Sequence, residues 1–101
     1  MINLLEETKE KLASCHKSPK DVLWIGTSDG SEAITWQEFE KLANFDYDDG
    51  YGSYEIRLDL VVVGKGWWLE RYEYDGSEWW VYKKQPKILK LHKELKELRG
   101  I

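Results

Sequence analysis

The sequence predicts an α+β fold in the order helix, short strand, helix, three-stranded antiparallel β-meander, C-terminal amphipathic helix. Three observations predict it: apolar residues at helical spacing near both ends of the chain, a capping box at residues 35–38, and alternating apolar and polar residues between residues 54 and 84. A chain of 101 residues is large enough for one hydrophobic core but not for two. We therefore expect a single domain over residues 1–101.

Two of the three helices are predicted in the first half of the chain. Ile2–Cys15 carries apolar residues at helical intervals, with glutamates early and lysines late, which suits the helix dipole. The second helix begins after Thr35, whose hydroxyl can accept from the backbone at Glu38 while the Glu38 carboxylate reaches back to Thr35. Trp36 and Phe39 share one face of this helix, so we expect both rings to reach the core.

The strands are predicted from short apolar runs and from the turns between them. Residues 22–25 indicate a short buried strand, and the run 54–64 alternates so regularly that it is expected to be the longest strand. Glycine-containing turns at 64–66 and 75–77 connect it to two further strands, 67–74 and 78–84, in an antiparallel meander. After Pro86, a C-terminal helix is expected because apolar residues recur at spacings of three and four, at Ile88, Leu91, Leu95 and Leu98.

Composition places the chain among folded proteins without a membrane span. Hydrophobic residues make up 42% and charged residues 34%, and no apolar run approaches the roughly 20 residues that cross a bilayer. The start of the sequence lacks the basic and apolar regions of a signal peptide. The lone Cys15 excludes an internal disulfide and agrees with a reducing compartment. A cytoplasmic location is therefore expected.

The net charge of −4 hides an uneven distribution. Residues 21–80 carry four basic against fourteen acidic side chains, whereas residues 81–101 carry seven basic against two acidic. An acidic centre repels a nucleic-acid backbone and attracts a basic protein surface. The lysines of the final segment alternate with Glu94 and Glu97 around a leucine stripe, which is typical of an ordinary surface helix. We therefore expect a basic protein as partner, and neither nucleic acid nor a membrane.

Aromatic residues dominate the segment WWLERYEYDGSEWW at residues 67–80. In the predicted strands, Trp68 and Tyr72 share one face with Glu70, while Trp67 and Leu69 share the other. Rings on both faces are buried only if helices cover both faces; otherwise one face stays open as a binding patch, because exposed aromatic clusters mark interaction sites. The sequence is compatible with both arrangements.

No pattern in the sequence supports catalysis or a cofactor. No glycine-flanked nucleophilic serine and no phosphate-cradling loop occur, and Glu70 and Glu73 fall on opposite strand faces, so they cannot share a proton-transfer site. The aspartates of FDYDDGYG also fail as a calcium loop, because Gly50 and Arg57 stand where oxygen ligands belong. We expect a protein that is not an enzyme.

Candidate partner-binding residues follow from the acidic centre and the aromatic segment. The loop after the second helix offers carboxylates and tyrosines, and residues 67–80 offer tryptophans and further carboxylates. The predicted binding residues are Asp46, Tyr47, Asp48, Asp49, Tyr51, Trp67, Glu70, Glu73, Asp75 and Trp79.

Three segments of the central portion, DVLWIG, WQEFEKLANFDYDDGYG and WWLERYEYDGSEWW, carry a resemblance that covers residues 21–86. On these segments the chain resembles a family of small uncharacterised proteins encoded by phages and prophages of Gram-positive bacteria. Small acidic phage proteins of this kind are often inhibitors of host defences, and some are anti-CRISPR proteins that bind the Cas nuclease of a type II system. The resemblance implies an inhibitor that binds a basic host protein, such as a Cas nuclease or its guide-RNA complex, and blocks its DNA binding or activity in the host cytoplasm.

Two other hypotheses stay open. In the first, Cys15, His16 and His92 bind zinc and stabilise a small module, although no CxxC or HxxxH spacing supports such a site. In the second, the chain is a homodimeric accessory phage protein whose open tryptophan face pairs with itself. A monomer or a homodimer is accordingly expected.

Overall fold

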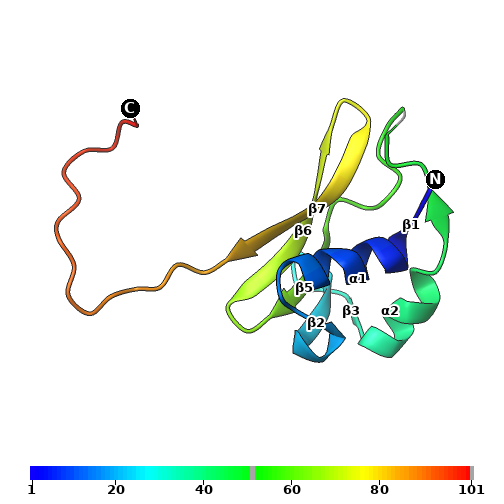
Figure 1. Ribbon diagram of the computed structural model, residues 1–101, viewed down its shortest axis with the longest axis horizontal. Helices are drawn as coiled ribbons and strands as arrows, with labels where there is room; N and C mark the ends of the chain where they lie inside the picture. Colours follow the sequence, from blue (N-terminus) through cyan, green and yellow to red (C-terminus); the bar gives the residue numbers. More distant parts are fainter. Residues whose placement is uncertain (51, 101) are drawn as a thin grey trace.

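Two helices and two antiparallel sheets make up the folded part of the chain. The computed structural model describes residues 1–50 and 52–100. Figure 1 shows the arrangement of the elements. In chain order they are β1 (Ile2–Asn3), α1 (Leu4–Ser14), the 3-10 turn η1 (Pro19–Asp21), β2 (Val22–Thr27), β3 (Ala33–Ile34), α2 (Trp36–Leu42), β4 (Asp46–Tyr47), β5 (Leu60–Gly64), β6 (Trp67–Tyr74) and β7 (Ser77–Lys84).

The main sheet has five strands, so the predicted α+β arrangement of three helices and a three-stranded meander is wrong. The strand order is β3-β2-β5-β6-β7, every pairing is antiparallel, and β1 and β4 form a separate two-stranded sheet. Among the described residues, more lie in strands than in helices. The meander of β5, β6 and β7 does form, but β2 extends it through pairs such as Ile25 with Val62, both of which are buried. Burial of these side chains favours a pairing between segments far apart in the sequence.

The predicted C-terminal helix is absent from the described residues. Residues 85–100 have no regular secondary structure and run away from the folded body (Figure 1). The four apolar residues of the predicted stripe, which are 77–90% exposed, are Ile88, Leu91, Leu95 and Leu98. An isolated helix of this length is marginal in water unless its apolar face packs against something. The periodic pattern is present, but within residues 85–100 the apolar stripe is not packed on a surface that would stabilise the helix.

The predicted strand 54–64 is also shorter than expected. Only Leu60–Gly64 pairs as β5, and residues 52–59 form a loop. The backbone amides of Glu55 and Ile56 donate to the Glu78 carboxylate instead of to a neighbouring strand. The alternating pattern does not lead to strand pairing here, because a buried carboxylate is a stronger hydrogen-bond acceptor for these amides than a backbone carbonyl.

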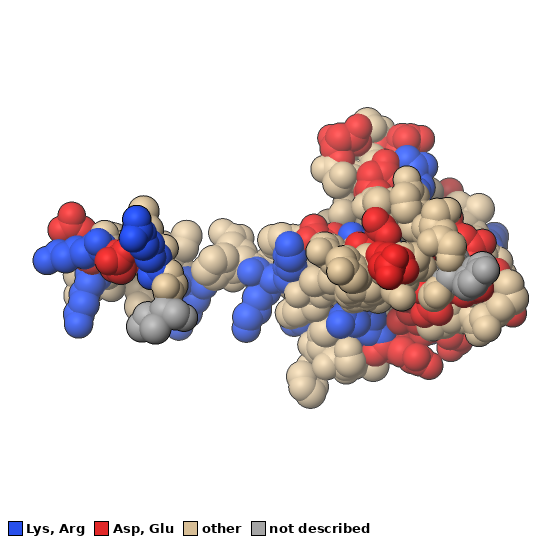
Figure 2. All heavy atoms as spheres, turned by 90° about the horizontal axis from the view of Figure 1, so that it is seen from above, with Lys and Arg blue, Asp and Glu red and all other residues tan. Residues whose placement is uncertain are grey.

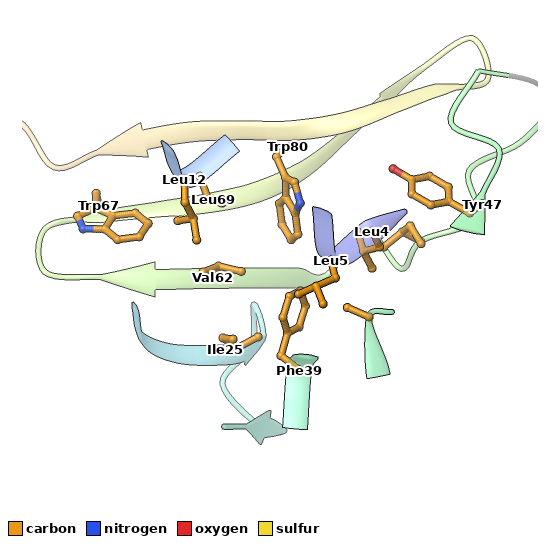
Figure 3. Close-up of a cluster of buried hydrophobic side chains, with 12 residues drawn as sticks. Leu4, Leu5, Leu12, Ile25, Phe39, Tyr47, Val62, Trp67, Leu69 and Trp80 are labelled. Atoms are coloured by element: carbon orange, nitrogen blue, oxygen red, sulfur yellow. The ribbon is translucent and has the colours of Figure 1, made fainter. Parts of the chain in front are cut away.

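Both helices pack on the same face of the main sheet, which we call the inner face. Leu12 from α1 and Phe39 from α2 lie in one cluster with sheet residues Ile25, Val62 and Trp80 (Figure 3). The opposite face of the sheet, the outer face, receives no buried residue from either helix. The two helices therefore leave one side of the aromatic strands without a helical cover.

The capping box predicted for the second helix is confirmed. The Thr35 hydroxyl accepts from the backbone amide of Glu38 at 3.1 Å, and the Glu38 carboxylate accepts from the amide of Thr35 at 3.0 Å. The hydrogen bond from the Thr35 amide is the largest cause of a lowered pKa of the Glu38 carboxylate, and the Thr35 side chain lowers it further. The box therefore fixes the start of α2, the helix from which Phe39 reaches the core.

Replacing Thr35 by alanine is expected to lower the free energy of unfolding by about 1 kcal/mol, because the first turn of α2 loses its side-chain acceptor. Thr35→Ser keeps the hydroxyl and should retain most of the stability. Urea unfolding of both variants measures the difference. Equal destabilisation by alanine and serine would contradict a capping role for the hydroxyl.

Candidate protein-binding surface

Three exposed rings lie side by side on the outer face near the β6–β7 turn. Tyr72 and Trp79 are cross-strand partners whose ring centroids are 5.4 Å apart. Tyr74 follows two residues later on the same face of β6. Tyr72 is 54%, Tyr74 71% and Trp79 39% exposed. We call these three residues the aromatic patch.

The β6–β7 turn brings carboxylates next to the aromatic patch. Asp75 and Gly76 have φ angles of 51° and 87°, which is the backbone of a tight two-residue hairpin turn. A side chain at Gly76 would meet the carbonyl oxygen of Gly52 at 2.5 Å, so the loop after β4 packs directly on this turn. The amide of Glu78 also donates to the carbonyl of Asp49 at 2.9 Å. The turn and the acidic loop thus form one end of the molecule.

We call the carboxylates at this end, Asp48, Asp49, Glu73 and Asp75, the acidic tip. Its loop is held by local hydrogen bonds: the amide of Asp48 donates to the Glu55 carboxylate at 2.7 Å, and the amide of Gly50 donates to Asp48 at 3.0 Å. Acidic side chains also cover other parts of the folded body, as Figure 2 shows. Asp75 of the turn follows Tyr74 directly and so lies beside the exposed rings, whereas Glu73, the cross-strand partner of Glu78, lies at the same end on the inner face.

A buried carboxylate fixes the far end of the same loop. The Glu78 side chain is completely buried on the inner face and accepts from the amides of Glu55 at 2.6 Å and Ile56 at 3.1 Å. Its third partner is the Arg71 guanidinium, at 3.0 Å. Because charged hydrogen bonds are stronger than neutral ones, Glu78 ties the loop to β7 and to the core.

Arg71 is the centre of a buried network that joins four elements. Its guanidinium pairs with Glu7 of α1 at 3.3 Å and with Glu78 of β7, and it donates to the Tyr47 hydroxyl of β4 at 3.1 Å. It also lies over the Trp80 ring, 4.8 Å from the centroid. A buried charge is tolerated only when it is paired, and two carboxylates meet this requirement here.

The surroundings of Tyr47 and Arg71 in this network shift the pKa of both groups. Burial raises the pKa of Tyr47, and the hydrogen bond that its hydroxyl donates to Glu7 adds to the effect. Burial opposes the charge of Arg71, yet the hydrogen bond to Tyr47 and the attraction of Glu7 outweigh it, so the pKa of Arg71 is raised. The tyrosine stays neutral and the arginine stays charged, which makes this a structural cluster.

The structure places the predicted binding residues in different environments. Tyr47 and Trp67 are only 2% and 3% exposed, so the prediction of an accessible surface is wrong for these two rings. Glu70 lies on the outer face and pairs with Lys83 at 2.6 Å, and Asp46 is exposed in β4. Tyr51 lies outside the described residues. Asp48, Asp49, Asp75 and Trp79 lie at the end of the molecule that carries the tip and the patch, and Glu73 lies at the same end but on the inner face.

Sequence reasoning did not assign roles to Glu7, Arg71 and Glu78. A signal for Arg71 was present, because it stands in the same alternation phase as Trp67 and Leu69 and therefore points toward the core. The position of Glu78 in phase with Trp80 carries the same signal. A charged residue in the buried phase of a strand predicts an internal partner, although the sequence does not show which residue that partner is.

The zinc hypothesis receives no support from the geometry. Within residues 1–50 and 52–100, no group of three histidine, cysteine, aspartate or glutamate side chains is close enough to hold a metal ion. Cys15 and His16 end α1, whereas His92 lies in the extended tail.

Comparison of the chain with known protein families, curated proteins and solved structures gave no match. A search of the described helices found none with the length and apolar character needed to span a bilayer.

Proposed function

We propose that the protein is a non-enzymatic inhibitor of phage origin that binds a basic surface of a host protein through the acidic tip and the aromatic patch. The observation that supports it best is the exposure of Tyr72, Tyr74 and Trp79 directly beside the carboxylates of the turn and of the loop. Tyrosine and tryptophan supply a large part of the binding energy at protein interfaces. Carboxylates around them favour a partner rich in arginine and lysine.

Rigidity of the surface adds to the proposal. Glu78 anchors the loop at Glu55 and Ile56, and the hairpin turn packs on the same loop at Gly52. A surface that is already ordered loses little conformational entropy when it binds. The loss of conformational entropy therefore opposes association only weakly.

A type II Cas nuclease is the specific partner that the resemblance to phage proteins suggests. The test is to measure binding of the purified nuclease, with and without guide RNA, by biolayer interferometry. Binding in either state that is lost on combined substitution of Tyr72 and Tyr74 by serine would support both the partner and the surface. Absence of binding in both states would remove the nuclease as partner but would leave the surface to be tested with other host proteins.

For those other partners, a photo-crosslinking amino acid at position 74 reports directly on the surface. The expected result is covalent capture of a basic host protein. The matched control carries the same amino acid at Leu23, which is also exposed but lies in β2, away from the tip. Equal capture from both positions would mean that contact at position 74 is nonspecific.

Replacing Asp46, Asp48 and Asp49 together by asparagine is expected to slow association with the partner and to reduce its dependence on salt. Three negative charges near the tip are lost, so electrostatic steering is weaker. Asparagine at position 48 can still accept the hydrogen bond from Gly50, and the fold should therefore remain intact. Association rates over a range of salt concentrations measure the effect.

A control variant of equal net charge separates a local effect from a general one. Glutamine at Glu6, Glu10 and Glu40 removes three charges from the helices, away from the tip. The association rate of this control should change less than that of the triple asparagine variant. The same loss of rate in both would show that only net charge matters, and that the tip is not the contact surface.

A further inference from the structure

The tail of the protein is chemically opposite to its body. Residues 85–100 carry five basic and two acidic side chains, whereas the body is strongly acidic (Figure 2). The apolar stripe of the tail is largely exposed to solvent. Within the described chain, the amide of Gln85, which donates to the carbonyl of Gly66, is the last group to join the tail to the body by a hydrogen bond. An amphipathic segment with an unpaired apolar stripe needs a surface to cover it.

The body offers an apolar groove at the end of the sheet near α2. The groove has a volume of about 510 Å³, and its apolar lining includes Ile34, Phe39, Leu42, Phe45, Ile56 and Leu60. Leu42 and Phe45 are large apolar residues exposed to solvent at this groove, with 65% and 43% of their surface accessible. Its volume is in the range of pockets that bind ligands.

Carboxylates border the groove. Glu32 and Glu55 line it. Arg57, the one basic residue among the described residues of its lining, is already paired with Asp59 at 2.6 Å and lies 3.8 Å from Glu32. An apolar floor with an acidic border matches a helix that has a leucine stripe and flanking lysines. Helices with this pattern bind in grooves through anchors at spacings of three and four residues.

We propose that residues 87–99 of one chain fold into an amphipathic helix that binds in this groove on a second copy, and that the exchange is reciprocal. The stripe of Ile88, Leu91 and Leu95 lies on the apolar floor, and the flanking lysines face the carboxylates of the border. A helix of residues 87–99 is about 20 Å long, which leaves room for these anchors along one face. Docking supplies the packing that the isolated segment lacks.

The position of the tail favours a second copy over the tail's own groove. Lys84 at the end of β7 pairs with Trp67, which pairs with Gly64 at the end of β5. The groove is lined by Leu60, at the other end of β5, roughly 13 Å away along the strand. Only two residues separate β7 from the proposed helix. Within its own chain, the helix would therefore begin at the end of the sheet that is opposite to the groove. A second copy meets no such restriction, and twofold symmetry gives each groove one tail.

This inference is independent of the proposed function, because the groove and the tail lie outside the acidic tip and the aromatic patch. The test is sedimentation velocity of the full-length protein over a wide concentration range, with far-UV circular dichroism of the same samples. The expected result is a concentration-dependent dimer whose helical signal rises as it forms. Leu91→Glu with Leu95→Glu in the tail should weaken the dimer at least about tenfold, since carboxylates would enter an apolar acidic groove.

Leu42→Glu changes the groove from the other side and should weaken the dimer to a similar extent. The matched control is Leu23→Glu, an exposed leucine that does not line the groove, and it should leave the dimer unchanged. A strict monomer overturns the proposal, whether its tail is helical, which would indicate docking within one chain, or not. A dimer that survives both the tail variant and Leu42→Glu also overturns it, because another surface would then hold the copies together.

Discussion

Replacing Arg71 by methionine is expected to lower the free energy of unfolding by about 3–5 kcal/mol, because the buried carboxylate of Glu78 and the partly buried carboxylate of Glu7 lose their shared cation. The Tyr47 hydroxyl loses its donor at the same time. Small proteins are stable by only about 5–15 kcal/mol, so this single change removes a large part of the total. Guanidinium unfolding followed by tryptophan fluorescence measures the loss.

The matched control is Arg57→Met. Arg57 also pairs with two carboxylates, but its side chain is more than half exposed, and exposed pairs contribute little. We therefore expect a much smaller loss of stability for Arg57→Met than for Arg71→Met. Similar losses for Arg57 and Arg71 would show that burial of the network does not matter, and would contradict the role assigned to Arg71.

Replacing Trp80 by alanine is expected to cost about 3–5 kcal/mol, the loss that follows from removing a large aromatic side chain from a core. Trp80 is only 2% exposed and belongs to the core cluster on the inner face, to which both helices contribute residues (Figure 3). Its indole N–H donates to the Thr8 hydroxyl at 2.9 Å, which in turn donates to the carbonyl of Leu4. The substitution leaves a cavity and removes the hydrogen bond that joins β7 to α1.

The neighbouring Trp79 is the natural control, because it lies on the opposite face of the same strand. Trp79→Ala should cost about 1 kcal/mol or less, as expected for a partly exposed side chain. It should instead weaken binding to the partner, because Trp79 belongs to the aromatic patch. Thermal unfolding and binding measured on both variants separate the two roles. If Trp79→Ala destabilised the fold as much as Trp80→Ala, the outer face would be part of a core.

The Arg71 network gives the proposed surface a structural basis. Glu78 is held by Arg71 on one side and holds the amides of Glu55 and Ile56 on the other. The order of the acidic loop therefore depends on a charge buried behind it. In the Arg71→Met variant, hydrogen exchange at the amides of Glu55 and Ile56 should accelerate before the rest of the protein unfolds.

Local features of the fold could be predicted from the sequence. The capping box before α2 and the turn at Asp75–Gly76 involve residues two or three positions apart, so their chemistry is visible in the sequence. The alternation in 67–74 also placed Trp68 and Tyr72 on one face and Trp67 and Leu69 on the other, as the structure does. Such periodicities report which side chains lie together on an element.

Other features were decided by tertiary structure alone. The sequence showed aromatic rings on both faces of the strands but not which face the helices cover, because that depends on where α1 and α2 pack. The pairing of β2 with β5 and the partners of Arg71 join residues far apart in the chain. In the tail, the helical pattern is present in the sequence, but the helix does not form. No surface buries Leu91 and Leu95 within the described residues, and the backbone remains extended. Short-range chemistry was thus determined by the sequence, whereas contacts between distant segments depend on the free energy of packing them, which no local pattern contains.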